Sequence, residues 1–328
     1  MRKRTLGKTD LELTTVGLGT WAMGGGGWDF GWGPQDDEES IATIHRALEL
    51  GIDWIDTAPV YGFGHAEEVV GRAIRGRRHE VTIATKCGLV WEPGNPTPIN
   101  RLGAESVRAE CEASLARLGI ETIDLYQIHW PDPEERIEEA WRAIDALIDA
   151  GKVRYGGVSN FDAGQLARVG AIRPVASLQP PYSMMARGIE SEILPHCARN
   201  GIGVVAYSPL RVGMLTGKVD RAWVDALPQD DWRRNSRDFR DPRLPVNLNT
   251  VEKLQGIARR AGRSVSELAI AWVLRRPEVT SAIVGARRPD QIEQTAPAAD
   301  WELSEETIAE IDRLLAERER AIAALDEE

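Results

Sequence analysis

The stretch ALELGIDWID (residues 47–56) carries the pattern that decides the fold: a helical run, a glycine and then an apolar strand. The same order recurs in ARLGIETIDLYQIH (116–129), IDAGKVRYGGVSN (148–160) and ARNGIGVVAYS (198–208). A glycine can adopt the left-handed conformation that closes a helix C-terminus, after which the chain turns into the next strand. We therefore expect four glycines to end helices that lead directly into strands: Gly51, Gly119, Gly151 and Gly201.

The helical runs before these glycines carry apolar residues with the helix period, for example Ile41, Ile44 and Leu48. The strands are short and mostly apolar, as expected when both of their faces are covered. This alternation predicts a parallel sheet, and eight units in one run favour a closed (β/α)₈ TIM barrel of ~250 residues plus additions. The expected strands lie near Val16–Gly19, Ile52–Asp56, Val81–Lys86, Ile123–His129, Val153–Val158, Val175–Gln179, Val204–Tyr207 and Ser281–Val284.

An open, doubly wound sheet is the alternative architecture. Its usual G-x-G-x-x-G motif is absent, because the first strand ends in GLGTWAMGGGG (17–27), where the glycines have a different spacing. No linker divides the chain, so we expect a single domain over residues 1–328 with an N-terminal hairpin and extra C-terminal helices. The longest stretch without a core pattern follows the seventh strand, from Arg211 to about Asn249, and loops of this length often form lids.

Composition and charge narrow the class of protein. The 328 residues are 42% hydrophobic and 28% charged, as in globular proteins, and the net charge of −11 argues against a nucleic-acid surface. The first residues lack the apolar segment of a signal peptide, and no window approaches 18 consecutive apolar residues. Cys87, Cys111 and Cys197 are far apart, which predicts free thiols in the cytoplasm and no metal site.

Polar residues gather where the predicted strands end, and in a TIM barrel the active site lies at those C-terminal ends. A lysine that ends an apolar strand is costly unless it is paired, and Asp56 on the neighbouring strand is the obvious partner of Lys86. The residues at the strand ends are Gly19-Thr20-Trp21, Asp56 with Tyr61 beyond it, Lys86, His129-Trp130, Ser159-Asn160, Gln179, Tyr207-Ser208-Pro209-Leu210 and Gly285-Ala286-Arg287-Arg288.

The chemistry of this set suggests proton donation to a carbonyl group. The ammonium of Lys86 would stabilise the phenolate of Tyr61 and lower its pKa from ~10 toward neutrality. A tyrosine tuned in this way is a general acid that can protonate a carbonyl oxygen, and His129 is suited to orient the same oxygen. A plain buried salt bridge between Asp56 and Lys86, with His129 satisfied in the core, is the structural alternative. A Schiff-base lyase that uses Lys86 as nucleophile is a chemical alternative, although Asp56 would raise rather than depress the pKa of Lys86.

The sequence resembles the aldo-keto reductase family along nearly its whole length. The resemblance is carried by VGLGTWAMGG, GIDWIDTAPVYGFGHAEEVVGRAI, IATK, IDLYQIHWPDP, GKVRYGGVSNF, LQPPYS, GIGVVAYSPL and GARRPDQIE. The segments WPDP, QPPYS and LTGK are most similar to the bacterial general-stress members. The resemblance implies an NADPH-dependent reductase of aldehydes and ketones, with Tyr61 as the acid, Asp56 and Lys86 tuning it, and His129 positioning the carbonyl.

A cofactor must supply the hydride, because no side chain donates one. The resemblance implies that Ser159, Asn160 and Gln179 hold the nicotinamide amide and that Tyr207 stacks on the ring. The remaining contacts that it implies come from three places: Gly19, Thr20, Trp21 and Asp56 near the nicotinamide, then Ser208, Pro209, Leu210, Gly213 and Lys218 along the pyrophosphate, and Gly285, Arg287 and Gln291 around the adenosine end.

We read Arg287 as the ligand of the 2′-phosphate, which favours NADPH over NADH, because an arginine beside a helix that starts near Pro289 suits a phosphate. The sequence departs from the family pattern at Gln294-Thr295, where many members carry Glu-Asn. Five arginines lie between Arg233 and Arg243; we expect most of them to be solvated and one or two to reach the phosphate.

Aromatic residues near the strand ends predict a substrate pocket formed by Trp21, Tyr61, Trp91, His129 and Trp130. Trp28 and Trp32 lie in the glycine-rich insertion GGGGWDFGWG (24–33), which either folds over this pocket or covers the barrel rim. The expected partner is a small carbonyl compound, with no nucleic acid or membrane. A cofactor-binding sensor with little turnover is the alternative function, and tight NADPH binding without carbonyl reduction would identify it.

Overall fold

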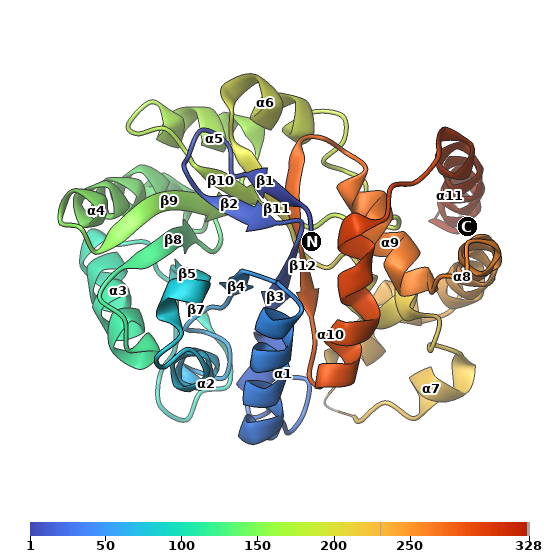
Figure 1. Cartoon of the computed structure of the whole chain (residues 1–328), viewed down its shortest axis with the longest axis horizontal. Helices are drawn as coiled ribbons and strands as arrows, with labels where there is room; N and C mark the ends of the chain where they lie inside the picture. Colours follow the sequence, from blue (N-terminus) through green and yellow to red (C-terminus); the bar gives the residue numbers. More distant parts are fainter. Residues whose placement is uncertain (230, 327–328) are drawn as a thin grey trace.

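The computed structural model describes residues 1–229 and 231–326, and its eight parallel strands close into a barrel, which confirms the predicted fold (Figure 1). Around the barrel the strands follow the order β10-β11-β12-β3-β4-β5-β8-β9. The chain therefore adds each new strand beside the previous one, as expected for a (β/α)₈ barrel. The strands are β3 (Val16–Gly19), β4 (Trp54–Asp56), β5 (Thr82–Cys87), β8 (Ile123–Ile128), β9 (Val153–Ser159), β10 (Ser177–Gln179), β11 (Gly203–Ala206) and β12 (Val279–Gly285).

Helices connect these strands and surround the barrel (Figure 1). The four glycines of the repeated pattern have φ angles of 84°, 65°, 75° and 66°, so each takes the left-handed conformation predicted from the sequence. The helices that pack around the barrel are α1 (Asp37–Glu49), α2 (His65–Ala73), α3 (Ala104–Leu118), α4 (Ile137–Asp149), α5 (Ala163–Gly170), α6 (Ile193–Asn200), α9 (Val265–Leu274) and α10 (Pro289–Thr295).

A hairpin and a buried tryptophan close the end of the barrel at which the strands begin. The antiparallel strands β1 (Lys3–Thr5) and β2 (Glu12–Thr14) place Leu6, Leu11 and Leu13 in one apolar cluster with Trp54. The indole Nε1 of Trp54 donates to the backbone oxygen of Thr14, at 3.1 Å. A side chain at Gly17 would lie only 2.0 Å from the Trp54 ring, so this position requires glycine. Side chains therefore fill the barrel at the end where its strands begin.

The segment after β11 is more ordered than the sequence suggested. It contains α7 (Arg221–Asp225) and 3₁₀ turns, and α8 (Arg243–Arg260) begins inside the stretch that we expected to be irregular up to Asn249. Pro245 disguises this helix in the sequence, but it lies in the first turn, where a proline costs no hydrogen bond. Helix α8 packs against the last helix, α11 (Glu305–Asp326), at the edge of the barrel where the C-terminus lies (Figure 1).

Two smaller features complete the fold. The strands β6 (Leu89–Val90) and β7 (Ile99–Asn100) form a short hairpin after β5. All three cysteines are free, as predicted, and the structure shows that they are also buried. No helix in the described part of the chain is both long and apolar enough to cross a membrane.

Candidate active site

Lys86 and Asp56 form a buried ion pair where the barrel strands end. Lys86 lies in β5 and Asp56 ends the neighbouring strand β4. Lys86 Nζ lies 2.9 and 2.8 Å from the two carboxylate oxygens of Asp56, and it also donates to the backbone oxygen of Thr57. The pairing confirms the partner predicted for Lys86. Burial lowers the pKa of Lys86, and the charge of Asp56 opposes this shift, so the carboxylate is what supports a charged ammonium here.

Tyr61 lies in the turn between β4 and α2, and its hydroxyl oxygen accepts a hydrogen bond from Lys86 Nζ at 3.2 Å. The sequence led us to expect a lowered pKa for Tyr61, and this expectation is wrong. Burial, together with the negative charge of Asp56, raises the pKa of Tyr61 well above its ordinary value of 10.0. The physical reason is that Asp56 compensates the charge of Lys86, so desolvation of the phenolate dominates. Tyr61 therefore holds its proton in the free protein.

His129 follows β8 and presents a neutral imidazole to Tyr61. Its ring meets the Tyr61 ring edge-on, with centroids 5.9 Å apart and an angle of 78° between the planes. Burial, and then the charge of Lys86, lowers the pKa of His129 well below 6.5. Its backbone N–H donates to Cys87, but within residues 1–229 and 231–326 the imidazole has no hydrogen-bond partner. The ring nitrogens are thus free to bind a ligand beside the Tyr61 hydroxyl.

The four residues predicted to hold the nicotinamide lie together next to His129. Asn160 Nδ2 donates to the backbone oxygen of His129 at 3.0 Å, and Asn160 Oδ1 accepts from the Tyr207 hydroxyl at 2.9 Å. The Ser159 hydroxyl donates to the backbone oxygen of Gln179 at 2.8 Å. Asn160 has a positive φ of 63°, a conformation that asparagine adopts more readily than most residues. Burial raises the pKa of Tyr207 to about 12, so its hydroxyl stays protonated and donates.

The turn after β11 contains residues with positive φ angles. Ser208 has a φ of 54° and Gly213 a φ of 101°, with Pro209 and Leu210 between them and Lys218 exposed beyond. Two strands further around the barrel, Gly19 ends β3, and Thr20 donates to the backbone oxygen of Asp56 through both its N–H and its hydroxyl. These residues therefore line one end of the barrel.

Arg287 is tied to the glycine-rich insertion. Its Nε donates to Gln35 Oε1 at 2.6 Å, its NH1 donates to the backbone oxygen of Trp32 at 3.1 Å, and its NH2 contacts the backbone oxygen of Pro34. Gln35 returns a hydrogen bond to the backbone oxygen of Arg287, and Gln291 accepts from the Arg287 backbone N–H. All these partners are neutral, and in the part of the chain that the structure describes no carboxylate pairs with Arg287.

Aromatic rings gather around Tyr61, with Trp21 at their centre. Trp21 stacks on Tyr61 at a centroid distance of 6.3 Å and on Trp232 at 6.2 Å. Trp32 of the insertion lies 6.2 Å from Trp21, and Trp28 is buried 6.3 Å from Tyr61. The insertion therefore folds over the site rather than covering a remote part of the rim.

Trp232 and Arg233 belong to this aromatic wall, and the sequence reasoning missed both. We expected most arginines of this loop to be solvated, whereas Arg233 is buried. Its guanidinium is paired with Asp231 at 2.6 Å and lies over the rings of Trp32 (4.4 Å) and Trp223 (5.0 Å). Arg233 thereby joins the insertion to the loop after β11. The only signal in the sequence was a tryptophan directly before paired arginines, in DDWRR (230–234).

Two of the predicted pocket residues lie further out. Trp91 stacks on Phe63 at 5.4 Å and lies beneath the guanidinium of Arg117, and no ring contact joins it to Tyr61 within the described residues. Trp130 is 43% exposed at the rim, as is Phe30 at 47%. These residues shape the entrance rather than the immediate surroundings of the Tyr61 hydroxyl.

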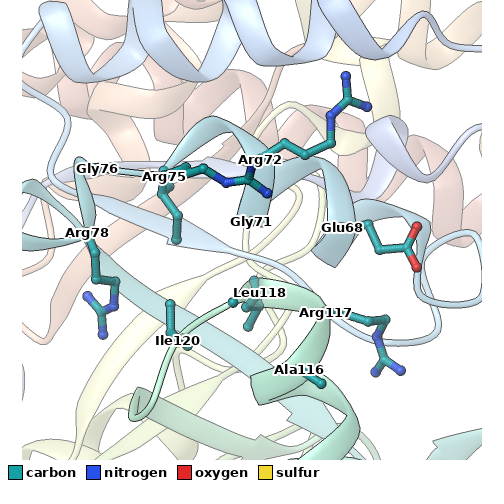
Figure 2. Close-up of a pocket in the computed structure, with 12 residues that line it drawn as sticks. Glu68, Gly71, Arg72, Arg75, Gly76, Arg78, Ala116, Arg117, Leu118 and Ile120 are labelled. Atoms are coloured by element: carbon teal, nitrogen blue, oxygen red, sulfur yellow. The ribbon is translucent and has the colours of Figure 1, made fainter.

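A surface hollow of about 310 Å³ lies between α2 and α3, away from this site. Its lining includes Gly76 and Gly119, which precede β5 and β8, so it belongs to the end of the barrel at which the strands begin. Figure 2 shows that Arg72, Arg78 and Arg117 there point in different directions. Each of the three already has a carboxylate partner: Asp37 for Arg72, Asp124 for Arg78 and Glu67 for Arg117.

Known proteins share the features of this barrel and its mouth. The model of the Aldo/keto reductase family matches residues 15–316. Aldo-keto reductase YhdN of Bacillus subtilis (strain 168) is 40% identical over 96% of this chain and 94% of its own length, and the NADH-specific methylglyoxal reductase of Escherichia coli (strain K12) is 37% identical over 93% and 95%.

Two solved structures are also similar. The glycerol dehydrogenase AKR11B4 from Gluconobacter oxydans superposes with a TM-score of 0.88 and 40% identity, covering 96% of this chain and 95% of its own. Aldo-keto reductase AKR11C1 from Bacillus halodurans, in its holo form, has a TM-score of 0.80 and 27% identity, covering 96% of each chain. The barrel is thus that of a family of oxidoreductases that act on small carbonyl compounds with a nicotinamide cofactor. The chain belongs to the aldo/keto reductase family.

Proposed function

We propose that the protein reduces aldehydes or ketones to alcohols with NADPH, and that Tyr61 is the general acid. The observation that carries the proposal is the position of Lys86 Nζ, which contacts the Asp56 carboxylate and the Tyr61 hydroxyl at the same time. This arrangement gives the phenol a cationic hydrogen-bond donor at the oxygen that loses the proton.

The protein side of the reaction is a proton transfer from Tyr61 Oη to the carbonyl oxygen of the substrate. The raised pKa keeps Tyr61 protonated until the substrate oxygen gains negative charge. Lys86 then stabilises the phenolate that remains, and Asp56 keeps Lys86 charged. The neutral imidazole of His129, which has no partner in the described chain, donates to the same oxygen and fixes its direction toward Tyr61.

The bound nicotinamide would supply the hydride. The residues fit such a group: Ser159, Asn160, Gln179 and Tyr207 form a polar wall beside His129, and Gln179 Oε1 accepts no hydrogen bond from the residues that the structure describes. We assign the carboxamide to Ser159, Asn160 and Gln179, and the ring to Tyr207. The turn of Ser208, Pro209, Leu210 and Gly213, with Lys218, would follow the pyrophosphate.

Arg287 supports NADPH over NADH. Its guanidinium has only neutral partners, so a 2′-phosphate would supply the counter-charge that it lacks. The same contacts also mean that a phosphate must share this guanidinium with the insertion. Because a relative whose name calls it NADH-specific is 37% identical to this chain, the experiment compares NADPH with NADH.

Aromatic aldehydes are the first substrates to test, because Trp21 and Trp28 lie against Tyr61 and Trp232 stacks on Trp21. The purified protein is mixed with an aromatic aldehyde and either NADPH or NADH, and cofactor oxidation is followed by absorbance. We expect turnover with NADPH, and we expect Tyr61→Phe to bind NADPH normally while its kcat falls about 10²–10⁴-fold.

Tyr155→Phe is the matched control for this experiment. It removes a hydroxyl that contacts Asp10 at the opposite end of the barrel, so it should leave turnover unchanged. Full activity of Tyr61→Phe would remove Tyr61 from the acid role. NADPH binding without turnover of any carbonyl compound in the wild type would refute the reductase itself.

A further inference from the structure

Gln179 connects the ion pair of Asp56 and Lys86 to two other residues of the polar wall, Ser159 and Asn160. It ends β10 and is buried, and its Nε2 donates to Asp56 Oδ1 at 2.8 Å. We propose that Gln179 is a positioning residue for proton transfer: besides any contact with the cofactor, it holds the Asp56 carboxylate in place against Lys86. This inference rests on the proposed function. It adds a second role for Gln179, whose first proposed role is to hold the nicotinamide carboxamide.

The direction of the Gln179 amide follows from its neighbour. A carboxylate only accepts hydrogen bonds, so the amide nitrogen must face Asp56. The carbonyl oxygen Oε1 then faces away and accepts no hydrogen bond within the described chain. The same NH₂ group also lies 3.5 Å from Gln127 Oε1. One side chain therefore offers a donor to the catalytic ion pair and an acceptor to a ligand N–H group.

The side chain of Asp56 has two hydrogen-bond donors among the described residues. Lys86 Nζ contacts both of its carboxylate oxygens, and Gln179 Nε2 donates to Oδ1. Burial opposes the charge on Lys86, and the Asp56 carboxylate restores it. Loss of the Gln179 donor would leave Lys86 as the sole anchor of the carboxylate, so the ammonium would be less well supported where it contacts Tyr61.

The backbone of Gln179 has a separate task. Its carbonyl oxygen accepts from the Ser159 hydroxyl at 2.8 Å and from the Asn160 N–H at 3.1 Å. Substitutions of the Gln179 side chain keep these two bonds. They therefore test the contact with Asp56 without dismantling the wall formed by Ser159 and Asn160.

Two variants separate the donor from the acceptor. Gln179→Leu removes both, whereas Gln179→Glu has the same shape, keeps an acceptor oxygen, and donates to Asp56 only while it is protonated. Ser177→Ala is the control, because Ser177 lies two residues earlier in β10 and its buried hydroxyl has no partner among the described residues.

We expect Gln179→Leu to lower kcat at saturating cofactor about tenfold, the scale of one hydrogen bond to a charged group, while Ser177→Ala keeps wild-type kcat. Gln179→Glu should be most active at low pH and lose activity as its carboxyl ionises, so its activity should fall at a lower pH than that of the wild type. A Gln179→Glu profile parallel to that of the wild type would contradict the proposal.

A measurement on the cofactor-free protein makes the test independent of turnover. The Lys86 ammonium is observed by NMR after ¹⁵N-lysine labelling and is assigned by its absence in Lys86→Met. In Gln179→Leu the ammonium should lose its proton at lower pH than in the wild type and in Ser177→Ala. If it titrates as in the wild type and only NADPH binding weakens, Gln179 is a cofactor ligand alone and the proposal fails. Absence of turnover in the wild type would instead refute the proposed function and leave this titration interpretable.

Discussion

The ammonium nitrogen of Lys86 lies 3.2 Å from the hydroxyl oxygen of Tyr61 and 2.8 Å from the carboxylate of Asp56. The buried ammonium of Lys86 thus contacts the Asp56 carboxylate and the Tyr61 hydroxyl at the same time. In the free protein, burial of Tyr61 and then the negative charge of Asp56 raise the pKa of Tyr61. In this arrangement Tyr61 keeps its proton until a substrate oxygen accepts it.

Removal of Lys86 should separate its structural role from its chemical role. Lys86→Met leaves Asp56 buried without its cation, so the free energy of unfolding should fall by about 3–5 kcal/mol. Adding Asp56→Asn removes the stranded charge and should restore most of that loss, while turnover stays at least about 100-fold below wild type because the phenolate lacks its cation. The double-mutant cycle compares four proteins: the wild type, the two single variants and the double variant. Urea unfolding gives the stability of each, and an activity assay gives its turnover. A double variant with restored activity would contradict the role of Lys86.

His129 should make stability depend on pH in a defined window. The pKa of His129 in the folded protein lies well below 6.5, whereas a histidine in the unfolded chain titrates near ~6.5. The unfolded chain therefore binds more protons as the pH falls below 6.5, and the free energy of unfolding decreases, by about 1.4 kcal/mol at one pH unit below that value. His129→Gln should lack this decrease, and His196→Gln on α6 should retain it. The measurement is denaturant unfolding of the two variants at pH 8.0 and pH 5.5. If His129 were protonated in the folded state, the free energy of unfolding would fall equally in His129→Gln and in His196→Gln.

Arg287 should set cofactor preference. Loss of its guanidinium should weaken NADPH binding at least about tenfold and change NADH binding much less, because a charge-assisted bond to phosphate is lost. Arg288→Ala is the neighbouring control, since Arg288 is paired with Asp290 on the surface. Dissociation constants from fluorescence titration would decide the matter. Equal weakening for both cofactors would show that Arg287 acts only by fastening the insertion.

Trp232 should affect the choice of substrate. Its ring lies parallel to Trp21 within 9°, and Trp21 in turn stacks on Tyr61. Trp232→Ala removes one apolar wall, so KM should rise more for aromatic aldehydes than for small aliphatic ones, while kcat changes little. Trp301→Ala, at a tryptophan that lies beneath Arg263, is the control. A fall in kcat with unchanged KM would place Trp232 in the chemistry instead of the pocket.

Gly17 should be intolerant of any side chain. Alanine there would place Cβ 2.0 Å from the Trp54 ring, and such overpacking costs about 1–3 kcal/mol. Gly256→Ala offers a contrasting control, because a Cβ in this part of α8 meets nothing within 4 Å and should stabilise the helix by about 0.5–1 kcal/mol. Thermal unfolding should shift in opposite directions for the two variants, and a neutral Gly17→Ala would show that Trp54 can move.

The sequence predicted those parts of the molecule that depend on local patterns. The glycines that follow helices, such as Gly51, and the strands that they precede were visible because conformation at a glycine is a local property. The pairing of Asp56 with Lys86 was predictable as well, because parallel strands bring their ends together.

Features that depend on contacts between distant loops were not visible. Trp232 stacks on Trp21 and Arg233 lies over Trp32, and no spacing in the sequence relates these residues. Helix α8 was hidden by Pro245, whose position in the first turn becomes known only from the structure. The pKa of Tyr61 depended on the balance between desolvation and two opposite charges, and residue types alone do not give that balance.

Trp54 and the leucines of the N-terminal hairpin, which close one end of the barrel, also determine how ligands can reach the active site. With one end of the barrel closed, every molecule that reaches Tyr61 must arrive and depart through the same mouth. If the proposed cofactor lies deeper in that mouth than the carbonyl compound, it must enter before the substrate and leave after the product.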